Sequence, residues 1–178
     1  MEKKLKKISK IVNFYLNNYL SKSNYSELIA PMKYGLFPGG KKIRSKIIFD
    51  VGKIFNINNK DLTILAASVE AIHAYSLIHD DLPCMDDDKL RRGKASTHVK
   101  FGESTAILAG NSLLTTAFEI LSDKNFNVDN KIKSRLVNFL SRCSGQTGIA
   151  GGQYLDLSYE KKKNFSSKNS KYGIKKNW

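Results

Sequence analysis

Apolar residues recur at helical spacing in several segments of the chain. Near the N-terminus this pattern comprises Leu5, Ile8, Val12, Tyr15, Leu16 and Tyr19, and in a second segment it comprises Ile43, Ile47, Ile48, Val51, Ile54 and Phe55. Both patterns predict amphipathic helices. Residues 61–80 are apolar on almost every side, which is typical of a helix buried within a bundle. Further helices are expected over about 103–121 and 130–143.

The fold class predicted from these patterns is all-α, because no segment shows sustained apolar alternation with period two. Loops are expected at 37–40, 83–96 and 122–129. The segment 145–157 contains too many glycines to favour a helix interior. Beyond Leu157 the apolar stripe is lost, so we expect one domain over 1–157 and a disordered or loosely docked Lys-rich tail over 158–178.

Composition is that of an ordinary globular protein, with 178 residues, 41% apolar and 26% charged. No uninterrupted apolar run reaches about 18 residues, and asparagines interrupt the apolar start, so we expect a cytoplasmic protein without membrane insertion. The two cysteines, Cys84 and Cys143, lack metal-site spacing and are interpreted as free thiols.

The net charge is +14, and the acidic residues are unevenly distributed. A positive charge alone would suggest nucleic acid, a membrane surface or a phosphorylated ligand. Five of the sixteen acids lie between Asp80 and Asp88, directly after the apolar helix. Like charges at this density repel one another and need either a cation or open solvent.

Carboxylate oxygens suit magnesium, which binds through one or two carboxylates together with substrate phosphates. In a continuous helix Asp80 and Asp86 would lie on different faces, but Pro83 should break the helix and allow the two to converge. A solvated acidic loop is the alternative. His73, seven residues before Asp80, shares its face, although a histidine in such a helix is also compatible with a core position.

Arginine is scarce in this chain, which has 25 Lys and only five Arg. Arg91 and Arg92 follow the acidic cluster in KLRRGK, and Arg44 lies in FPGGKKIRS, where two glycines precede a predicted helix start. Guanidinium groups form bidentate hydrogen bonds with phosphate oxygens. The occurrence of both arginine-containing segments together with an acidic cluster of this kind favours a diphosphate site.

Four strings together resemble the trans-isoprenyl diphosphate synthases: GGKKIR, EAIHAYSLIHDDLPCMDDDKLRRGK, HVKFGESTAILAGNSLL and GGQYLDL. The resemblance covers about residues 25–157 and is strongest to the bacterial members that make farnesyl diphosphate. It implies an isoprenoid-synthase-type helical bundle around a central cavity. It also implies a prenyltransferase that condenses an allylic diphosphate (dimethylallyl or geranyl) with isopentenyl diphosphate, as a dimer.

The same resemblance implies roles for individual residues. Magnesium ligands would be Asp80, Asp81 and Asp86; contacts to isopentenyl diphosphate would be Lys41, Arg44, His73 and Arg92; and Arg91 would contact the allylic diphosphate. Asp80, Asp86 and Arg91 would be catalytic. Tyr75 and Ser76, just before the first aspartate, would set product length, and the aromatic Tyr75 favours a C15 product. Packing of Tyr75 in the core is the alternative.

Family members carry a second aspartate-rich motif and a Lys-Thr pair that this sequence lacks. We therefore expect a C-terminally truncated synthase with little or no activity as an isolated chain. Three alternatives remain: a binding subunit or fragment that associates with a full-length synthase, a metal-dependent HD-type phosphohydrolase built on His79 and Asp80, and a nucleic-acid role that rests on net charge alone.

Overall fold

The computed structural model describes residues 2–22, 27–37 and 40–160. These residues divide into two compact units, one before and one after the boundary between Asn138 and Phe139, which lies inside a helix. Residues 161–178 of the predicted tail lie outside the described residues, as do Pro38 and Gly39 of the predicted loop 37–40.

The described elements follow one another along the chain as α1 (Glu2–Leu20), α2 (Ile29–Leu36), α3 (Ile43–Ile54), α4 (Asn59–Asp80), β1 (Leu90–Arg91), β2 (Lys94–Ala95), α5 (Thr97–Phe101), α6 (Glu103–Ser122), α7 (Asn130–Ser144) and α8 (Ile149–Glu160). The two short strands form an antiparallel hairpin. The all-α class predicted from the sequence is therefore confirmed.

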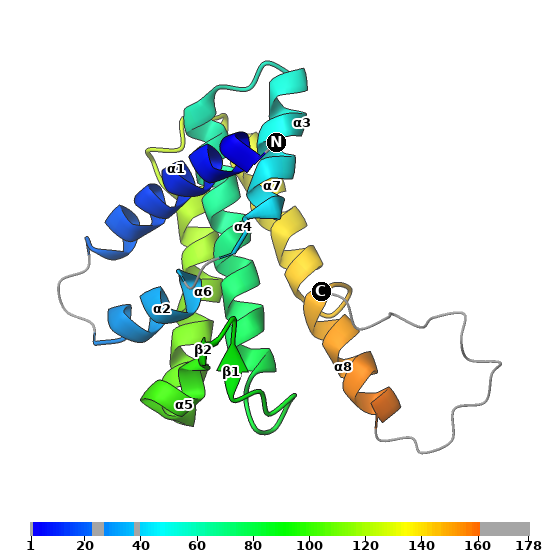
Figure 1. Cartoon of the computed structure of the whole chain (residues 1–178). Helices are drawn as coiled ribbons and strands as arrows, with labels where there is room; N and C mark the ends of the chain where they lie inside the picture. Colours follow the sequence, from blue (N-terminus) through cyan, green and yellow to red (C-terminus); the bar gives the residue numbers. More distant parts are fainter. Residues whose placement is uncertain (1, 23–26, 38–39, 161–178) are drawn as a thin grey trace. The chain divides into compact units, whose positions relative to one another are not determined.

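Helix α4 is the central element of the first unit. It packs most extensively on α6, and α3, α1 and α2 also contact it (Figure 1). Its apolar residues are buried on several sides, including Leu62, Ile64, Ala67 and Ile78. The helix begins where the Asn58 side chain accepts a hydrogen bond from the Asp61 backbone N–H at 2.9 Å, a regular N-cap.

Small residues let the neighbouring helices approach α4 closely. A Cβ added to Gly52 in α3 would lie 2.1 Å from Cδ2 of Leu62, and one added to Gly110 in α6 would lie 2.2 Å from Nε2 of His79. The buried Ser68 hydroxyl donates a hydrogen bond of 2.8 Å to the carbonyl of Ala117 in α6. These contacts fix the register between the helices.

The predicted helices α1, α3, α4, α6 and α7 are confirmed within a few residues at each end. Three further elements were not predicted. The first is α2, which is short and contains Pro31. The second is the hairpin within the expected loop 83–96, and the third is α5 after it.

The expectation that glycines disfavour a helix interior within 145–157 is wrong, because α8 includes Gly151 and Gly152 and continues to Glu160. Its start depends on another glycine. A Cβ added to Gly148 would lie 1.8 Å from the Cys143 carbonyl oxygen, so the turn between α7 and α8 needs a residue without a side chain.

By length and composition α4 could cross a membrane, although 61% of its apolar window is buried inside the protein. Burial of that extent is typical of a core helix.

We expect Gly52→Ala to lower the free energy of unfolding by about 1–3 kcal/mol, since the added methyl group must displace Leu62. Chemical denaturation of both proteins measures this. Val51→Ala, at a neighbouring exposed position, should change stability by less than about 0.5 kcal/mol. Equal effects at the two positions would contradict the proposed close packing.

Candidate functional site

Helix α4 carries ionisable side chains along its second half and at its end. Glu70 is 2% exposed, His73 and Asp80 are partly exposed, and Asp81, directly after the helix, is 3% exposed. Buried carboxylates are rare unless they are paired. The partners of these groups therefore define what the site contains.

The chain turns back after α4, as the prediction of a break at Pro83 requires. The backbone N–H of Met85 donates to the Leu82 carbonyl at 2.9 Å, and that of Asp86 donates to the Asp80 carbonyl at 2.9 Å. These hydrogen bonds bring Asp80 and Asp86, six residues apart, next to each other at the end of the helix.

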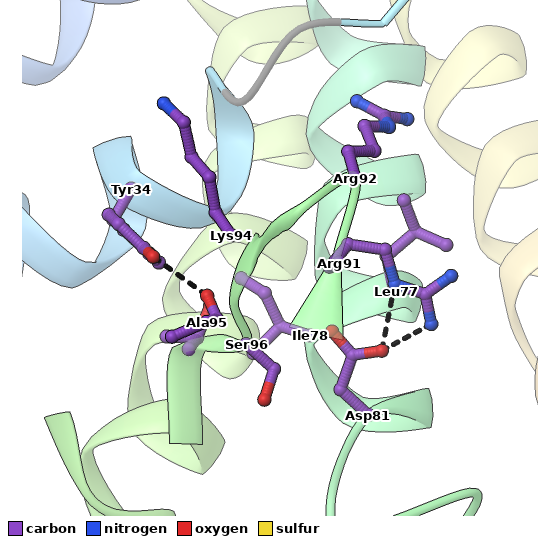
Figure 2. Close-up of a pocket in the computed structure, with 11 residues that line it drawn as sticks. Tyr34, Leu77, Ile78, Asp81, Arg91, Arg92, Lys94, Ala95 and Ser96 are labelled. Carbon is purple, nitrogen blue, oxygen red and sulfur yellow. Dashed lines mark hydrogen bonds and ion pairs between the residues drawn. The ribbon is translucent and has the colours of Figure 1, made fainter. Parts of the chain in front are cut away.

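Asp81 forms a hydrogen-bonded ion pair with Arg91. Its Oδ1 accepts from Arg91 Nε at 2.8 Å and also from Nη2 (Figure 2). Burial raises the pKa of Asp81, while the hydrogen bonds and charge of Arg91 act in the opposite direction. The hydrogen bond to Asp81 in turn raises the pKa of Arg91. This arrangement makes Arg91 the partner of a buried acid.

The hairpin explains how two consecutive arginines reach different surroundings. Leu90 pairs with Ala95 and Arg91 with Lys94, leaving Arg92 and Gly93 as a two-residue turn. Both have positive φ, 55° and 76°, as a type I′ turn requires. Figure 2 shows the Arg91 side chain directed to Asp81 and that of Arg92 directed away from it.

The Arg92 guanidinium lies against Gly40, which precedes Lys41 and Lys42 in the basic segment before α3. A Cβ added to Gly40 would lie 2.6 Å from Nη1 and 3.0 Å from Cζ of Arg92. Two basic segments about fifty residues apart in the sequence, 40–44 and 91–94, therefore meet at this contact.

His73 lies among these positive charges. Its pKa is lowered to about 4, first by burial and then by the charges of Arg44, Arg92 and Lys42, whereas Glu70 acts in the opposite direction. The structure thus groups Arg44, His73 and Arg92 in one basic cluster, and the ring of His73 is neutral at pH 7. Lys41 precedes this cluster in the chain and is exposed.

Tyr75 and His79 form an edge-to-face ring pair with centroids 5.2 Å apart. Burial, followed by the charge of Asp80, raises the pKa of Tyr75. The Ser76 hydroxyl donates to the His73 carbonyl at 3.0 Å, within its own helix. Their predicted role in product length remains a prediction.

His79 faces α6 and not the acidic loop, since its Nε2 lies 3.1 Å from the Ile107 carbonyl oxygen. The described residues contain no group of three or more His, Cys, Asp or Glu side chains arranged to hold a metal. In this part of the chain, therefore, neither the ligand set that an HD-type enzyme requires nor the predicted set of Asp80, Asp81 and Asp86 forms such a three-residue group.

Helix α2 holds the hairpin in place. The Tyr34 hydroxyl donates to the Ala95 carbonyl at 2.7 Å (Figure 2). The cavity enclosed there, between Tyr34, Leu77, Asp81 and the hairpin, is about 20 Å³. Such a volume holds about one water molecule, so this gap is not large enough for a prenyl substrate.

The carboxylates of Asp80 and Asp86 fit a magnesium ion shared with a diphosphate. Both offer hard oxygen donors, and the turn after α4 brings the two residues together. Asp81 differs, because one of its oxygens already accepts from Arg91. Its predicted role as a metal ligand stays a prediction.

Comparison with known proteins agrees with this arrangement. The family model of the polyprenyl synthetases matches residues 25–175. The chain belongs to the polyprenyl synthetase family. The resemblance identified from the sequence is thus confirmed.

Individual family members agree with this assignment. Farnesyl diphosphate synthase of Buchnera aphidicola (from Acyrthosiphon pisum) is 47% identical over 150 residues, which are 84% of this chain and 53% of that protein. The enzyme of Escherichia coli K12 is 48% identical over 136 residues, 76% of this chain and 46% of its own length. The chain therefore spans about half the length of these curated relatives.

Two solved structures of prenyl-transferring enzymes have the same fold. A geranyltransferase from Legionella pneumophila superposes with a TM-score of 0.87 at 35% identity, covering 93% of this chain and 59% of that one. An FPP/GFPP synthase from Zymomonas mobilis gives 0.83 at 34%, covering 94% and 63%. The isoprenoid-synthase-type bundle predicted from the sequence is confirmed for the part of the fold present.

Several residues at the site were not singled out from the sequence. Lys42 and Glu70 form a buried ion pair, and Tyr34 holds the hairpin. A glutamate within an almost wholly apolar helix was the available signal for the pair, since such a residue needs a partner. No local pattern points to Tyr34.

We expect His73→Gln to flatten the acid dependence of stability. The folded-state pKa of about 4 lies below the ordinary 6.5, so protonation of the unfolded chain costs stability as pH falls from 6.5 towards 4 and has no effect above that window. For a partly exposed ring the loss by pH 5 is about 1 kcal/mol after allowance for solvent screening. Urea denaturation at pH 7 and pH 5 measures it, and equal pH dependence in both proteins would contradict this account.

Arg91→Met should lower the free energy of unfolding by about 2 kcal/mol, because Asp81 would remain buried without its partner. The double variant with Asp81→Asn should recover part of the loss. Lys89→Met, which removes an exposed pair with Asp87, serves as the control and should cost less than about 0.5 kcal/mol. Equal losses for Arg91 and Lys89 in urea denaturation would contradict the proposal.

Proposed function

We propose that this chain forms the diphosphate-binding part of a prenyltransferase that joins an allylic diphosphate to isopentenyl diphosphate and yields farnesyl diphosphate. One observation carries the proposal, namely the contact of the Arg92 guanidinium with Gly40, and the charges of Arg92 and Arg44, which both act on His73, accompany it. The names of the similar proteins, farnesyl diphosphate synthases at 47–48% identity, support the same chemistry.

The basic cluster has the properties of an anion site. Like charges held close together repel one another, and a bound diphosphate would relieve that repulsion. Arg44 and Arg92 offer guanidinium groups, Lys41 an ammonium group, and a neutral His73 can donate one hydrogen bond without adding charge. We assign isopentenyl diphosphate to this cluster.

The acidic end of α4 is assigned to the allylic diphosphate. Asp80 and Asp86 would hold magnesium, which when bound neutralises charge on the leaving diphosphate. Arg91 pairs with Asp81, and its Nη2 also lies 3.3 Å from Oδ2 of Asp88; the charge of Asp80 acts on it as well. These carboxylates keep it protonated, so its N–H groups that are not engaged in these pairs can donate to the same anion. Asp81 keeps Arg91 oriented, and this is its best supported role.

The apolar side of α4 near Tyr75 would bind the growing prenyl chain. Tyr75 is half-buried and stands five residues before Asp80, so its ring can limit the length of that chain. This supports a C15 product. The dimeric state, association with a full-length synthase and cytoplasmic location remain predictions from the resemblance.

Calorimetry with inorganic pyrophosphate, with and without magnesium, tests the proposal. Arg44→Gln and Arg92→Gln should each weaken binding by about tenfold or more, since each removes a charge-assisted hydrogen bond. Asp80→Asn and Asp86→Asn should abolish the strengthening by magnesium and leave magnesium-free binding intact.

Arg135→Gln in α7 is the matched control, because this arginine belongs to neither basic segment. Failure of the folded wild-type chain to bind pyrophosphate, or an equal loss in the control, would overturn the proposal. Synthesis of farnesyl diphosphate by the chain alone would support a catalytic protein, and synthesis only after mixing with a full-length synthase would support a binding subunit.

A further inference from the structure

The start of α3 is held by a buried network that the proposed reaction does not use. Oε1 of Glu70 accepts hydrogen bonds from the Ser45 hydroxyl at 2.7 Å and from the Ser45 backbone N–H at 3.2 Å. Oε2 lies 3.2 Å from Nζ of Lys42. All three side chains are buried: that of Lys42 is 8% exposed and that of Glu70 is 2% exposed.

The Glu70 side chain, which belongs to α4, caps the N-terminus of α3. Lys42 occupies the N-cap position and provides no side-chain cap. The N–H of Ser45 belongs to the first turn and has no acceptor within the helix. A carboxylate at this place satisfies that N–H and also interacts favourably with the positive end of the helix dipole.

The network also holds an unfavourable backbone conformation. Lys42 has φ 47° and ψ 45°, in the left-handed region that residues other than glycine rarely adopt. Its Nζ is fixed by Glu70 and by the Leu36 carbonyl at 3.4 Å. Such conformations persist where surrounding contacts determine them, often at functional sites.

The turn at Lys42 sets the direction of the chain between Gly40 and Arg44. Gly40 receives the Arg92 guanidinium, and Arg44 lies near His73. We propose that Glu70, Ser45 and Lys42 are positioning residues, which hold the left-handed turn and thereby set Gly40 and Lys41 in register with Arg44 and Arg92 to receive a diphosphate. This inference rests on the proposed function.

The sign of the effect of Glu70 separates positioning from simple electrostatics. An acid on α4 near an anion site repels the anion, so charge alone predicts that Glu70→Gln strengthens pyrophosphate binding. Loss of the anchor predicts the reverse, because misplacement of binding groups by about 1 Å costs much of their effect. We expect binding to weaken roughly tenfold.

The experiment compares the pyrophosphate affinity of the wild type, Glu70→Gln and Ser45→Ala by calorimetry, with folding verified by circular dichroism. Ser45→Ala keeps the Glu70 charge and removes one hydrogen bond, so it should weaken pyrophosphate binding less than Glu70→Gln does. It also replaces Glu70→Gln as the test variant if the latter does not fold. Asp50→Asn is the control, since Asp50 lies farther along α3 and pairs with Lys46 of the same helix and with Lys4 of α1. It should leave affinity unchanged.

The outcomes distinguish this inference from the function on which it rests. In one case the wild type binds pyrophosphate and Arg44→Gln loses binding, so the site is supported. If a folded Glu70→Gln then binds at least as tightly as the wild type, the positioning role is wrong. Ser45→Ala decides in the same way if Glu70→Gln does not fold. If the wild type does not bind at all, both fail. Weakening in the Glu70 and Ser45 variants, with the control unchanged, supports the positioning role.

Discussion

The charges that α4 carries into the core require partners, and this requirement organises the rest of the site. Glu70 and Asp81 are almost fully buried, and a buried carboxylate without a partner would destabilise the fold. Their partners are Lys42, Ser45 and Arg91. Each partner belongs to a loop or helix start that also carries a proposed substrate ligand. The interactions that pair the buried carboxylates therefore also bring the proposed ligands together.

Two basic segments, Lys41 and Lys42 before α3 and Arg91 and Arg92 in the hairpin, share one arrangement. In each, one cation pairs with a buried carboxylate and its neighbour in the sequence stays at the surface. Lys42 is anchored to Glu70 while Lys41 is exposed, and Arg91 is anchored to Asp81 while Arg92 is exposed against Gly40. Lys42 and Arg92 both have positive φ, which separates the directions of the neighbouring side chains. Anchoring one member of each pair orients the other.

The long helices were predictable because their apolar stripes arise within a single segment. The apolar run of 61–80, with an Asn-based N-cap before it, determines α4. The short elements were not predictable in this way. The hairpin has two residues in each strand and is held by Tyr34 from α2, and α8 tolerates internal glycines. Elements of that size depend on tertiary contacts that outweigh local propensity.

By itself the sequence determined the helical class, the break at Pro83 and the kinds of side chain available for a metal and a diphosphate, because these follow from periodicity, proline chemistry and residue type. Only the tertiary structure decided which of two adjacent cations forms an ion pair with a buried carboxylate. That choice depends on whether a carboxylate from α4 comes within hydrogen-bond distance, as Glu70 does for Lys42 and Asp81 for Arg91. Distances between residues that lie ten or more positions apart in the sequence cannot be obtained from spacing along one chain.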